Sequence, residues 1–326
     1  MKTTNNIIIN KNSAKNIEED IGLSKSKCLV MLSTYNGEKY IYEQVMSIIN
    51  QKNVFCDLLI RDDGSNINTK LVLKKLYDEY PNRINILYEE NKGIHYSFSK
   101  LINIAQLNYE YYAFADQDDI WDFDKLFVAI SAMKQNDSDF YSCCARLVDS
   151  NGVYMNRDTS SIKVYEFYMN SPHKILTPGV QGCTMVVSHK MFKDLRMKNM
   201  PEKYGHDTWF PIVAYYFYSC IYDANPHMNY RQHDKSWTGN RKKKIKQLFI
   251  DINYFIKGMS RYKELASDFL ERYEGDLNAE EKEYLNGLIN NDNFFRRCYY
   301  IKKCKYSKEN SLKTMFLRLY YLFGCM

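Results

Sequence analysis

Between residues 28 and 125 the sequence alternates four times between a short apolar run and a longer segment with helical spacing. The apolar runs are Cys28–Thr34, Phe55–Ile60, Ile84–Tyr88 and Tyr111–Ala115. Short runs that are apolar throughout are typical of strands buried on both faces of a sheet. Strands that alternate with helices form right-handed βαβ units. The sequence therefore predicts an α/β fold with a mostly parallel central sheet.

The segments between these runs have the spacing of helices that bury one face. Within Glu38–Asn50, Ile41, Val45 and Ile48 recur at intervals of three and four residues, which places them on one stripe of a helix. A helix is also expected over Ser97–Leu107. Beyond residue 125 the alternation is less regular, although residues 140–148 favour a strand and residues 206–217 a helix.

Polar side chains follow each of the four predicted strands. They are Thr34, Tyr35 and Asn36 after the first, Asp62 and Asp63 after the second, Lys92 and Gly93 after the third, and Asp116, Gln117, Asp118 and Asp119 after the fourth. Ligands of such sheets bind outside the carboxyl ends of the strands. We therefore expect these four groups to converge on one binding site.

Three carboxylates, Asp116, Asp118 and Asp119, lie within four residues directly after the fourth strand. Like charges this close repel one another, which costs stability unless a cation compensates. Carboxylate oxygens suit Mg²⁺ or Mn²⁺, and both ions also bind phosphate oxygens. The cluster therefore predicts a divalent-metal site. An acidic turn in which Asp119 or Asp122 caps the next helix is the alternative interpretation.

The other strand ends contain groups that suit a nucleotide. A carboxylate of Asp62 or Asp63 can accept hydrogen bonds from a base or a ribose. Gly93 allows close approach of the backbone, and Lys92 supplies positive charge for a phosphate. Residues 34–36 offer stacking and hydrogen bonding to a nucleoside. Each group alone is equally compatible with an ordinary turn, so the prediction depends on their convergence.

Two further residues lie outside the four units. Asp207 follows His206 at the expected start of an apolar helix, where a carboxylate either caps the helix or acts as a general base toward a hydroxyl. His233 follows Tyr230-Arg231-Gln232, and its imidazole is either structural or a metal ligand. The residues alone leave both alternatives open.

Motifs and charge exclude several classes of protein. The sequence has no Gly-x-x-x-x-Gly-Lys-Ser/Thr loop, no Gly-x-Gly-x-x-Gly turn and no Gly-x-Ser-x-Gly elbow. The formal charge of +6 is concentrated in residues 241–326, which hold 18 Lys/Arg against 11 Asp/Glu. Residues 1–240 are therefore nearly neutral, which argues against a nucleic-acid partner for the main domain. The nine cysteines are odd in number and are expected to be buried thiols in a reducing cytoplasm.

Composition divides the chain into three parts. Residues 1–26 are polar and are expected to be a flexible segment, residues 27–239 form the predicted α/β catalytic domain, and residues 240–326 form a basic, helical extension. The sequence contains no stretch of about 18 uncharged apolar residues, so no transmembrane helix is predicted. The start of the chain also lacks the apolar core of a secretory signal, so we expect a cytoplasmic protein.

Six motifs follow one another along residues 32–233. They are Leu-Ser-Thr-Tyr-Asn-Gly at 32–37, Asp-Asp-Gly-Ser at 62–65, Asn-Lys-Gly at 91–93, Asp-Gln-Asp-Asp-Ile-Trp at 116–121, His-Asp-Thr-Trp at 206–209 and Tyr-Arg-Gln-His at 230–233. With these motifs the sequence resembles the family 2 glycosyltransferases, and most closely their bacterial rhamnosyltransferase-like subgroup. The resemblance covers Lys27–Gly239 and implies the GT-A fold, a Rossmann-like, mostly parallel sheet flanked by helices.

The resemblance also implies a role for each motif. Such enzymes move a sugar from a nucleotide diphosphate with inversion of the anomeric carbon, using Mn²⁺ or Mg²⁺. Asp116 and Asp118 would form the Asp-x-Asp metal motif, with Asp118 as the direct ligand. His233 would approach the metal or the diphosphate, and Asp207 would be the general base. The nucleotide-sugar would contact Thr34, Tyr35, Asn36, Asp62, Asp63, Lys92, Gly93, Asp116 and Gln117.

The partners follow from the same resemblance. The donor would be dTDP-rhamnose or a UDP-hexose, and the acceptor a saccharide or lipid-linked saccharide of a bacterial capsule or O-antigen. Leu312–Phe323 mixes aliphatic, aromatic and cationic residues, which suits peripheral contact with the inner face of the cell membrane. Packing on the domain or against a second copy of the chain is the alternative. The alternative functions are a nucleotidyl- or phosphotransferase and a catalytically inactive sugar-nucleotide-binding protein.

Overall fold

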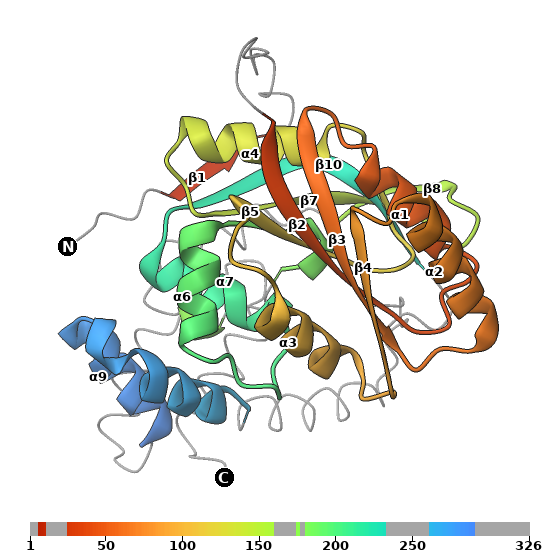
Figure 1. Ribbon diagram of the computed structural model, residues 1–326. Helices are drawn as coiled ribbons and strands as arrows, with labels where there is room; N and C mark the ends of the chain where they lie inside the picture. Colours follow the sequence, from red (N-terminus) through yellow and green to blue (C-terminus); the bar gives the residue numbers. More distant parts are fainter. Residues whose placement is uncertain (1–5, 11–24, 160–173, 177–179, 233–260, 291–326) are drawn as a thin grey trace, which may run out of the picture. The chain divides into compact units, whose positions relative to one another are not determined.

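The computed structural model describes residues 6–10, 25–159, 174–176, 180–232 and 261–290 (Figure 1). The chain divides into two compact units. One comprises Met1–Ile162 and Pro178–Trp237, and the other comprises Lys163–Thr177 and Thr238–Met326. The domain limits expected from the sequence, 27–239 and 240–326, remain predictions, and this division also assigns residues 163–177 to the second unit.

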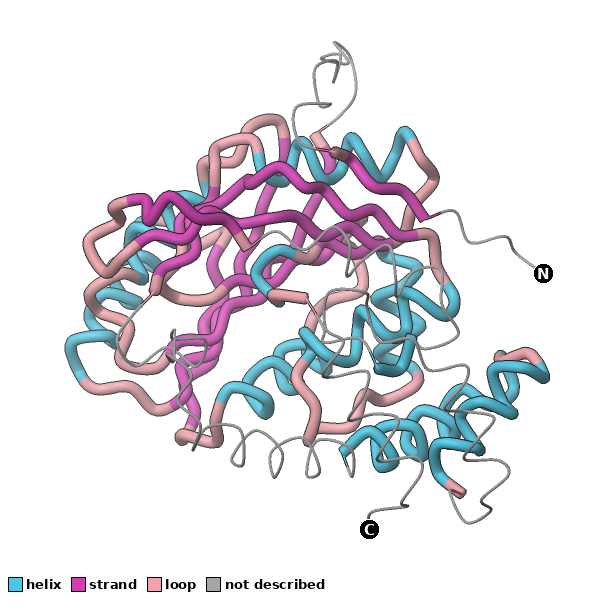
Figure 2. The backbone as a smooth tube through the Cα atoms, turned by 180° about the vertical axis from the view of Figure 1, so that it is seen from behind, coloured by secondary structure: helices cyan, strands magenta, loops and turns pink. Residues whose placement is uncertain are grey.

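A ten-stranded sheet forms the centre of the first unit (Figure 2). Its strands run in the order β1-β10-β7-β9-β5-β2-β3-β4, with β6 paired to β10 and β8 to β7. Their bounds are β1 (Asn6–Ile9), β2 (Ser26–Thr34), β3 (Val54–Asp63), β4 (Ile84–Glu89), β5 (Tyr111–Ala115), β6 (Ile120–Trp121), β7 (Phe140–Val148), β8 (Tyr154–Asp158), β9 (Val186–Ser188) and β10 (Cys220–Arg231).

The strands β5, β2, β3 and β4 are parallel to one another, as are β7, β10 and β1, while β9 is antiparallel to both of its neighbours. The α/β fold with a mostly parallel sheet is therefore confirmed. The register brings the carboxyl ends of the four predicted strands to one edge: Thr34 pairs with Asp62, Asp62 with Tyr88, and Leu32 with Ala115. This edge is where the polar groups were expected.

Helices cover both faces of the sheet (Figure 1). Val30 and Leu32 of β2 share a core with Ile41, Val45 and Ile48 of α1, the stripe that the sequence predicts. Phenylalanines of α3, β5 and α7 pack on the opposite face. The helices of this unit are α1 (Ile41–Ile49), α2 (Ile67–Glu79), α3 (Ile94–Ile104), α4 (Lys125–Gln135), α6 (His189–Met197) and α7 (His206–Phe217).

Two helices of the first unit begin at a side-chain cap that the sequence supplies. The Asn66 side chain accepts a hydrogen bond from the backbone N–H of Thr69 at 3.0 Å, at the start of α2. The Ser188 hydroxyl accepts one from the N–H of Met191 at 3.2 Å, at the start of α6. Each bond satisfies a donor that the first helical turn would otherwise leave without a partner.

The strands β1, β6, β8 and β10 were not predicted from the sequence. The strand β1 lies within residues 1–26, which were expected to be flexible, and it pairs in parallel with β10. The strand β10 contains Pro226, and its register against β7 shifts on both sides of that residue. Proline removes a backbone donor and interrupts the alternation by which strands are recognised.

The second unit is helical where the structure describes it. Residues 261–273 are helical, and they are followed by η3 (Glu274–Asp276) and α9 (Ala279–Ile289). Asn278 and Glu281 form a capping box at the start of α9. Lys174, in η1 (Lys174–Leu176), lies 3.4 Å from the Glu281 carboxylate. The helical character expected of the C-terminal extension is confirmed for these residues, whereas Leu312–Phe323 lies outside the described ones.

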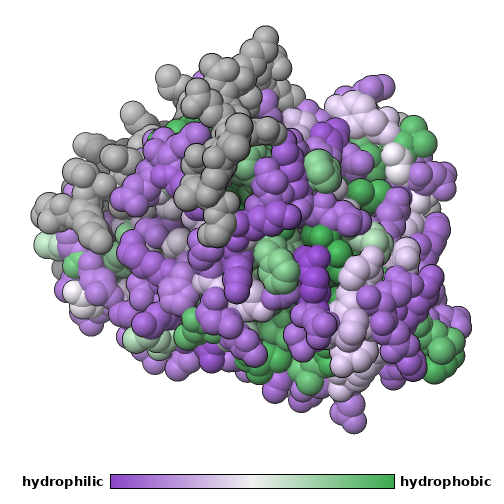
Figure 3. Space-filling model, turned by 45° about the horizontal axis from the view of Figure 1, so that its top comes forward, coloured by the Kyte–Doolittle hydropathy of each residue, from purple (hydrophilic) through white to green (hydrophobic). Residues whose placement is uncertain are grey.

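Hydrophobic side chains on the face shown in Figure 3 lie in small groups among hydrophilic ones. Ile67, Phe123 and Met197 are among the large hydrophobic residues that are exposed. Within the described ranges, no helix is long and apolar enough to cross a membrane.

Arg61, near the end of β3, is a buried cation that joins three elements. Its guanidinium donates to the carboxylates of Asp63 and Glu89 and to the Ser97 hydroxyl of α3. The side chain has no exposed surface. A buried cation is tolerated only when it is paired and hydrogen-bonded. Arg61 therefore holds the ends of β3 and β4 against α3.

We predict that Arg61→Met lowers the free energy of unfolding by about 3–5 kcal/mol, because Asp63 would remain buried without its cation. Urea denaturation at pH 7 measures the change. Lys74→Met is the matched control, because it breaks an exposed pair with Asp78 on α2 and should leave the unfolding midpoint unchanged. An Arg61→Met protein as stable as the wild type would contradict this role.

Candidate active site

Gln117 ties the end of β5 to the end of β2. Its Oε1 accepts hydrogen bonds from the Thr34 hydroxyl at 2.7 Å and from the Tyr35 N–H at 2.9 Å, and its Nε2 donates to the Tyr35 carbonyl at 3.2 Å. A Cβ on Gly37 would lie 2.3 Å from this Oε1. Glycine is therefore needed at position 37, and the acidic segment is held against residues 34–37.

The loops after β2, β3 and β4 are joined in the same way. The N–H of Asn36 donates to the Ser65 hydroxyl, and the Asn36 side chain accepts from the N–H of Asn66, both at 2.9 Å. Gly64 has a φ of 78°, and a Cβ there would lie 2.7 Å from the N atom of Asn91. This close approach of two backbones requires glycine. The four polar groups predicted from the sequence do converge on one edge.

The two carboxylates at the end of β3 are occupied by the protein's own backbone. Asp63 accepts hydrogen bonds from the N–H groups of Lys92 at 2.8 Å and of Gly93 at 2.9 Å. Asp62 accepts from the N–H of Ser65 at 3.3 Å. Asp63 thus shapes the loop that carries Lys92, whose ammonium lies 4.8 Å from the centre of the Tyr96 ring.

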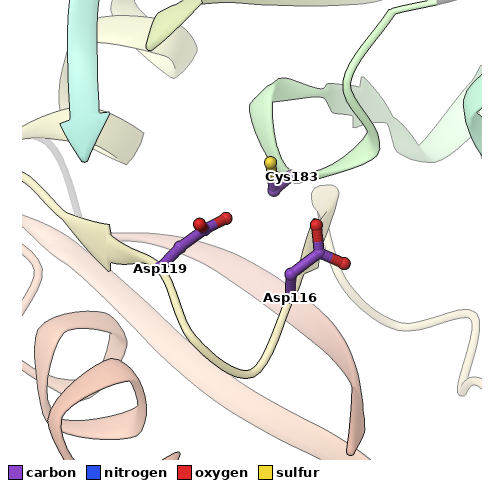
Figure 4. A group of neighbouring side chains, drawn as sticks. All are labelled: Asp116, Asp119 and Cys183. Atoms are coloured by element: carbon purple, nitrogen blue, oxygen red, sulfur yellow. The ribbon is translucent and has the colours of Figure 1, made fainter. Parts of the chain in front are cut away.

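Asp116 lies beside two buried side chains, Asp119 and Cys183 (Figure 4). Their ligand atoms all lie within 4.8 Å of one another. Cys183 comes from η2 (Gly182–Thr184), far along the chain from β5. Asp119 and Cys183 are each 1% exposed, whereas Asp116 is half-buried. Two carboxylates and a thiol are a set that can bind a metal ion.

Burial and, after it, charge repulsion disfavour the ionised carboxylates of this group. Burial, and then the charges of Asp118 and Asp207, raises the pKa of Asp116 to about 7. Burial and the charges of Asp116 and Asp118 raise the pKa of Asp119 well above its usual range. Negative charges that are close together and poorly solvated favour the neutral form of each carboxyl. A divalent cation would relieve this repulsion.

Arg231, at the end of β10, fixes the acidic segment through its backbone and side chain. Its N–H donates to the Asp119 carboxylate at 3.2 Å, and its Nε donates to the Asp118 carbonyl at 2.8 Å. The guanidinium also lies over the Tyr40 ring, 4.5 Å from its centre. The motif at 230–233 therefore reaches the acidic segment through Arg231, while His233 itself lies outside the described residues.

Asp207 lies in the first turn of α7, where the half-buried carboxylate benefits from the positive end of the helix dipole. Its charge acts on Asp116, so the structure brings the proposed base and the acidic segment into one site. Gly205 gives the Asp207 side chain room, since a Cβ there would lie 2.2 Å from its Oδ1 and 3.4 Å from the Nε2 of His95.

His206, beside Asp207, is buried between aromatic rings. Its ring centre lies 3.9 Å from that of Phe98 and 4.5 Å from that of Phe114. A Cβ on Gly182 would lie 2.2 Å from the His206 Nε2. Burial, with a smaller contribution from His95, lowers the pKa of His206 to about 3. A neutral imidazole thus connects the start of α7 to η2, the segment that carries Cys183.

The sequence pattern of glycosyl transferase family 2 matches residues 29–196, about half of the chain. This chain belongs to that family.

The glycosyltransferase is similar to several known proteins. It is 32% identical to the dTDP-rhamnosyl transferase RfbG of Shigella flexneri, over 64% of this chain and 73% of that protein. It is 24% identical to the UDP-Glc:alpha-D-GlcNAc-diphosphoundecaprenol beta-1,3-glucosyltransferase WfgD of Escherichia coli, over 70% of this chain and 86% of that protein. Residues 1–349 of S. aureus TarS, in complex with UDP-GlcNAc, share the fold with a TM-score of 0.56 and 19% identity, over 92% and 82% of the two chains.

Sequence reasoning missed three residues of this glycosyltransferase's site. Asp119 was considered only as a member of the acidic cluster or as a helix cap, and Cys183 was grouped with the buried thiols. Arg231 was quoted within its motif without a role. Proximity to Asp116 identifies Asp119 and Cys183, and hydrogen bonds identify Arg231. The assignment of Asp118 as the direct metal ligand stays a prediction.

We predict that His206 makes the glycosyltransferase sensitive to acid. Its pKa is about 3 in the folded protein and about 6.5 in the unfolded chain. The unfolded chain therefore takes up a proton that the folded protein does not. The resulting loss of stability begins near pH 6.5, grows by about 1.4 kcal/mol per pH unit, and ends near pH 3.

His206→Gln should remove this contribution, so that its stability falls less steeply than that of the wild type below pH 6.5. Chemical denaturation at a series of pH values measures the slope of stability against pH for each protein. The reference is pH 7.5, where the wild-type imidazole is neutral in both the folded and the unfolded chain. Identical slopes in the two proteins would show that His206 is not a buried neutral group.

Proposed function

We propose that the protein is an inverting, metal-dependent glycosyltransferase that moves a sugar from a nucleotide diphosphate to a hydroxyl group of a bacterial surface polysaccharide. The observation that carries this proposal is that Asp207 and Asp118 both lie close enough to Asp116 for their charges to act on its carboxyl. Transfer with inversion needs a base that acts on the acceptor and a cation that binds the leaving diphosphate. Asp207 is proposed as the base, and the acidic segment is proposed to hold the cation.

The names of the similar proteins support the choice of substrates. RfbG is a dTDP-rhamnosyl transferase, and WfgD acts on a saccharide linked to diphosphoundecaprenol. We therefore propose dTDP-rhamnose or a UDP-hexose as the donor, and a saccharide or lipid-linked saccharide as the acceptor. Such an acceptor would place the enzyme at the inner face of the cell membrane.

The acidic segment fits a divalent ion, because its carboxylates repel one another and the buried Asp119 Oδ2 has no N–H or O–H donor among the described residues. Asp118 and Asp116 would hold Mn²⁺ or Mg²⁺, both of which prefer oxygen ligands. His233 is proposed to approach the same ion. The ion would supply positive charge for the diphosphate as it leaves.

The residues of this chain perform the remaining steps. The Asp207 carboxylate accepts the proton of the acceptor hydroxyl as that oxygen attacks the anomeric carbon. The bond from this carbon to the diphosphate oxygen breaks on the opposite face, so the configuration inverts in a single displacement. No covalent intermediate with the protein is required. Partial burial of Asp207 at a helix start holds the base in place.

The polar groups at the other strand ends are proposed to hold the nucleotide. Thr34, Tyr35 and Asn36 would line the nucleoside pocket, with Gln117 fixing their backbone. Asp62 and Asp63 would face the base or the ribose. Because Asp63 accepts from the N–H groups of Lys92 and Gly93, it would also place the loop that approaches the phosphates.

Nucleotide release from a panel of donors separates this proposal from its alternatives. The panel contains dTDP-rhamnose and several UDP-hexoses, each with and without Mn²⁺ and with a lipid-diphosphate-linked saccharide acceptor. We expect release of a nucleoside diphosphate from one donor in the presence of Mn²⁺. Pyrophosphate release from a nucleoside triphosphate would instead indicate a nucleotidyltransferase. An absence of release with every donor would indicate a catalytically inactive binding protein.

We predict that Asp207→Asn lowers kcat for transfer by at least about 100-fold, because the base is lost. The Kd for the donor should not change, since Asp207 is assigned to the acceptor. Steady-state kinetics and calorimetric donor binding measure the two quantities. Glu202→Gln, which changes an exposed carboxylate shortly before α7, is the control and should retain activity. Near-normal transfer by Asp207→Asn would overturn the base assignment.

We predict that Asp118→Asn abolishes the metal-dependent part of nucleotide binding, because an amide is a much poorer ligand for a hard cation than a carboxylate. Calorimetric titration of the nucleoside diphosphate, with and without Mn²⁺, measures this part. Asp124→Asn, farther along the same acidic stretch, serves as the control. If Mn²⁺ strengthened nucleotide binding equally in Asp118→Asn and in the wild type, the metal assignment would be wrong.

A further inference from the structure

We propose that Asp116, Asp119 and Cys183 form a second, thiolate-containing metal site that binds thiophilic divalent ions such as Zn²⁺ or Cd²⁺. The ligand atoms of the three residues lie within 4.8 Å of one another (Figure 4). Three protein ligands with one open position are a common arrangement for zinc. Tetrahedral bonds of about 2.0–2.3 Å place ligand atoms roughly 3.3–3.8 Å apart, so the group would contract when it binds an ion.

A second observation points to a ligand. The Asp119 side chain is 1% exposed, and its Oδ1 accepts a hydrogen bond from the N–H of Arg231 at 3.2 Å. Its Oδ2 is buried and has no N–H or O–H donor in the part of the chain that the structure describes, and the group beside this carboxyl is the Cys183 thiol. Buried polar atoms without partners are rare because they are costly. A bound cation would satisfy this oxygen.

The group is held by two parts of the chain, the loop between β5 and β6 and the short helix η2. Asp116 follows β5, Asp119 precedes β6, and Cys183 lies in η2. The approach of His206 to Gly182 restrains η2, and the backbone of Arg231 restrains Asp119. Cys183 and Asp119 are buried, but Asp116 is half-buried and leaves an entry for an ion. A site of this kind is restrained before the ion binds.

The ligand set selects for a different metal from the one proposed for catalysis. A thiolate with two carboxylates suits Zn²⁺ and Cd²⁺, whereas Mg²⁺ and Mn²⁺ prefer oxygen ligands alone. Asp116 belongs to both sites. A thiophilic ion would therefore compete with the catalytic ion for this carboxylate and would inhibit the enzyme. This inhibitory consequence rests on the proposed function, whereas binding of the thiophilic ion does not.

The second group of ligand atoms in the described residues is less available to an ion. It consists of Asp122, Asp124 and His227. The Asp122 carboxylate is paired with Arg146, and the His227 Nε2 lies 3.0 Å from an Asp223 oxygen. These partners would have to be displaced, and the group contains no thiol. It provides a matched comparison for the experiment.

The experiment is a Cd²⁺ titration of the metal-free, full-length protein, followed by the ultraviolet charge-transfer absorption of a cadmium thiolate. No donor or acceptor is present, so the result does not depend on sugar transfer. We expect the wild type to develop the band with roughly one Cd²⁺ per chain. Cys183→Ser should lose that band. Cys143→Ser, at another buried free cysteine, and His227→Gln should both retain it.

Asp119→Asn provides an independent readout, because it keeps the cysteine and a side-chain acceptor for Arg231. We expect its Cd²⁺ affinity to fall by more than about tenfold, because loss of a direct ligand should cost at least as much as the roughly tenfold loss seen for residues that only support a ligand. The proposal is overturned if no band forms, if Cys183→Ser binds Cd²⁺ as the wild type does, or if Asp119→Asn retains full affinity. If the wild-type protein bound Cd²⁺ as expected but released no nucleotide from any donor, the proposed function would be overturned and the proposed metal site would not.

Discussion

Mutual repulsion among carboxylates at the end of β5 is the constraint on which the rest of the site depends. The charges of Asp118 and Asp207 act on Asp116, and those of Asp116 and Asp118 act on Asp119. Such an arrangement lowers the stability of the folded protein unless a cation is bound. Stability sacrificed in this way is typical of sites where charge is used in chemistry. The repulsion therefore supports the interpretation of this segment as a cation-binding site.

The scaffold holds these charges together by hydrogen bonds from two neighbouring strand ends. Gln117 fastens the acidic segment to the end of β2, and Arg231 fastens it to the end of β10 through its N–H and its Nε. The cation of Arg61 serves the neighbouring strand ends instead. The acidic segment is thus fixed in position at the edge of the sheet.

The part of the fold that could be predicted from the sequence is the part that local pattern determines. The strands β2 to β5 and the helices between them follow from apolar runs, spacing and caps, because each unit buries residues that are close in sequence. The strand β10 depends on pairing with distant strands and is interrupted by Pro226, so no local pattern reveals it. In the site, Asp116 was proposed as a metal ligand from residue type and position, whereas Asp207 was proposed as the base because of the family resemblance. Cys183 was not predicted, because only the fold brings its thiol to the acidic segment.

The central claim is that the acidic segment after β5 binds a divalent ion on the diphosphate of the donor. Anomalous X-ray diffraction from crystals grown with Mn²⁺ and a nucleoside diphosphate tests it most directly. The account predicts a manganese peak that is coordinated by a carboxylate of Asp118 or Asp116 and by oxygens of the diphosphate. A peak at Asp122, Asp124 and His227, or a nucleotide bound at the strand ends without manganese, would contradict it.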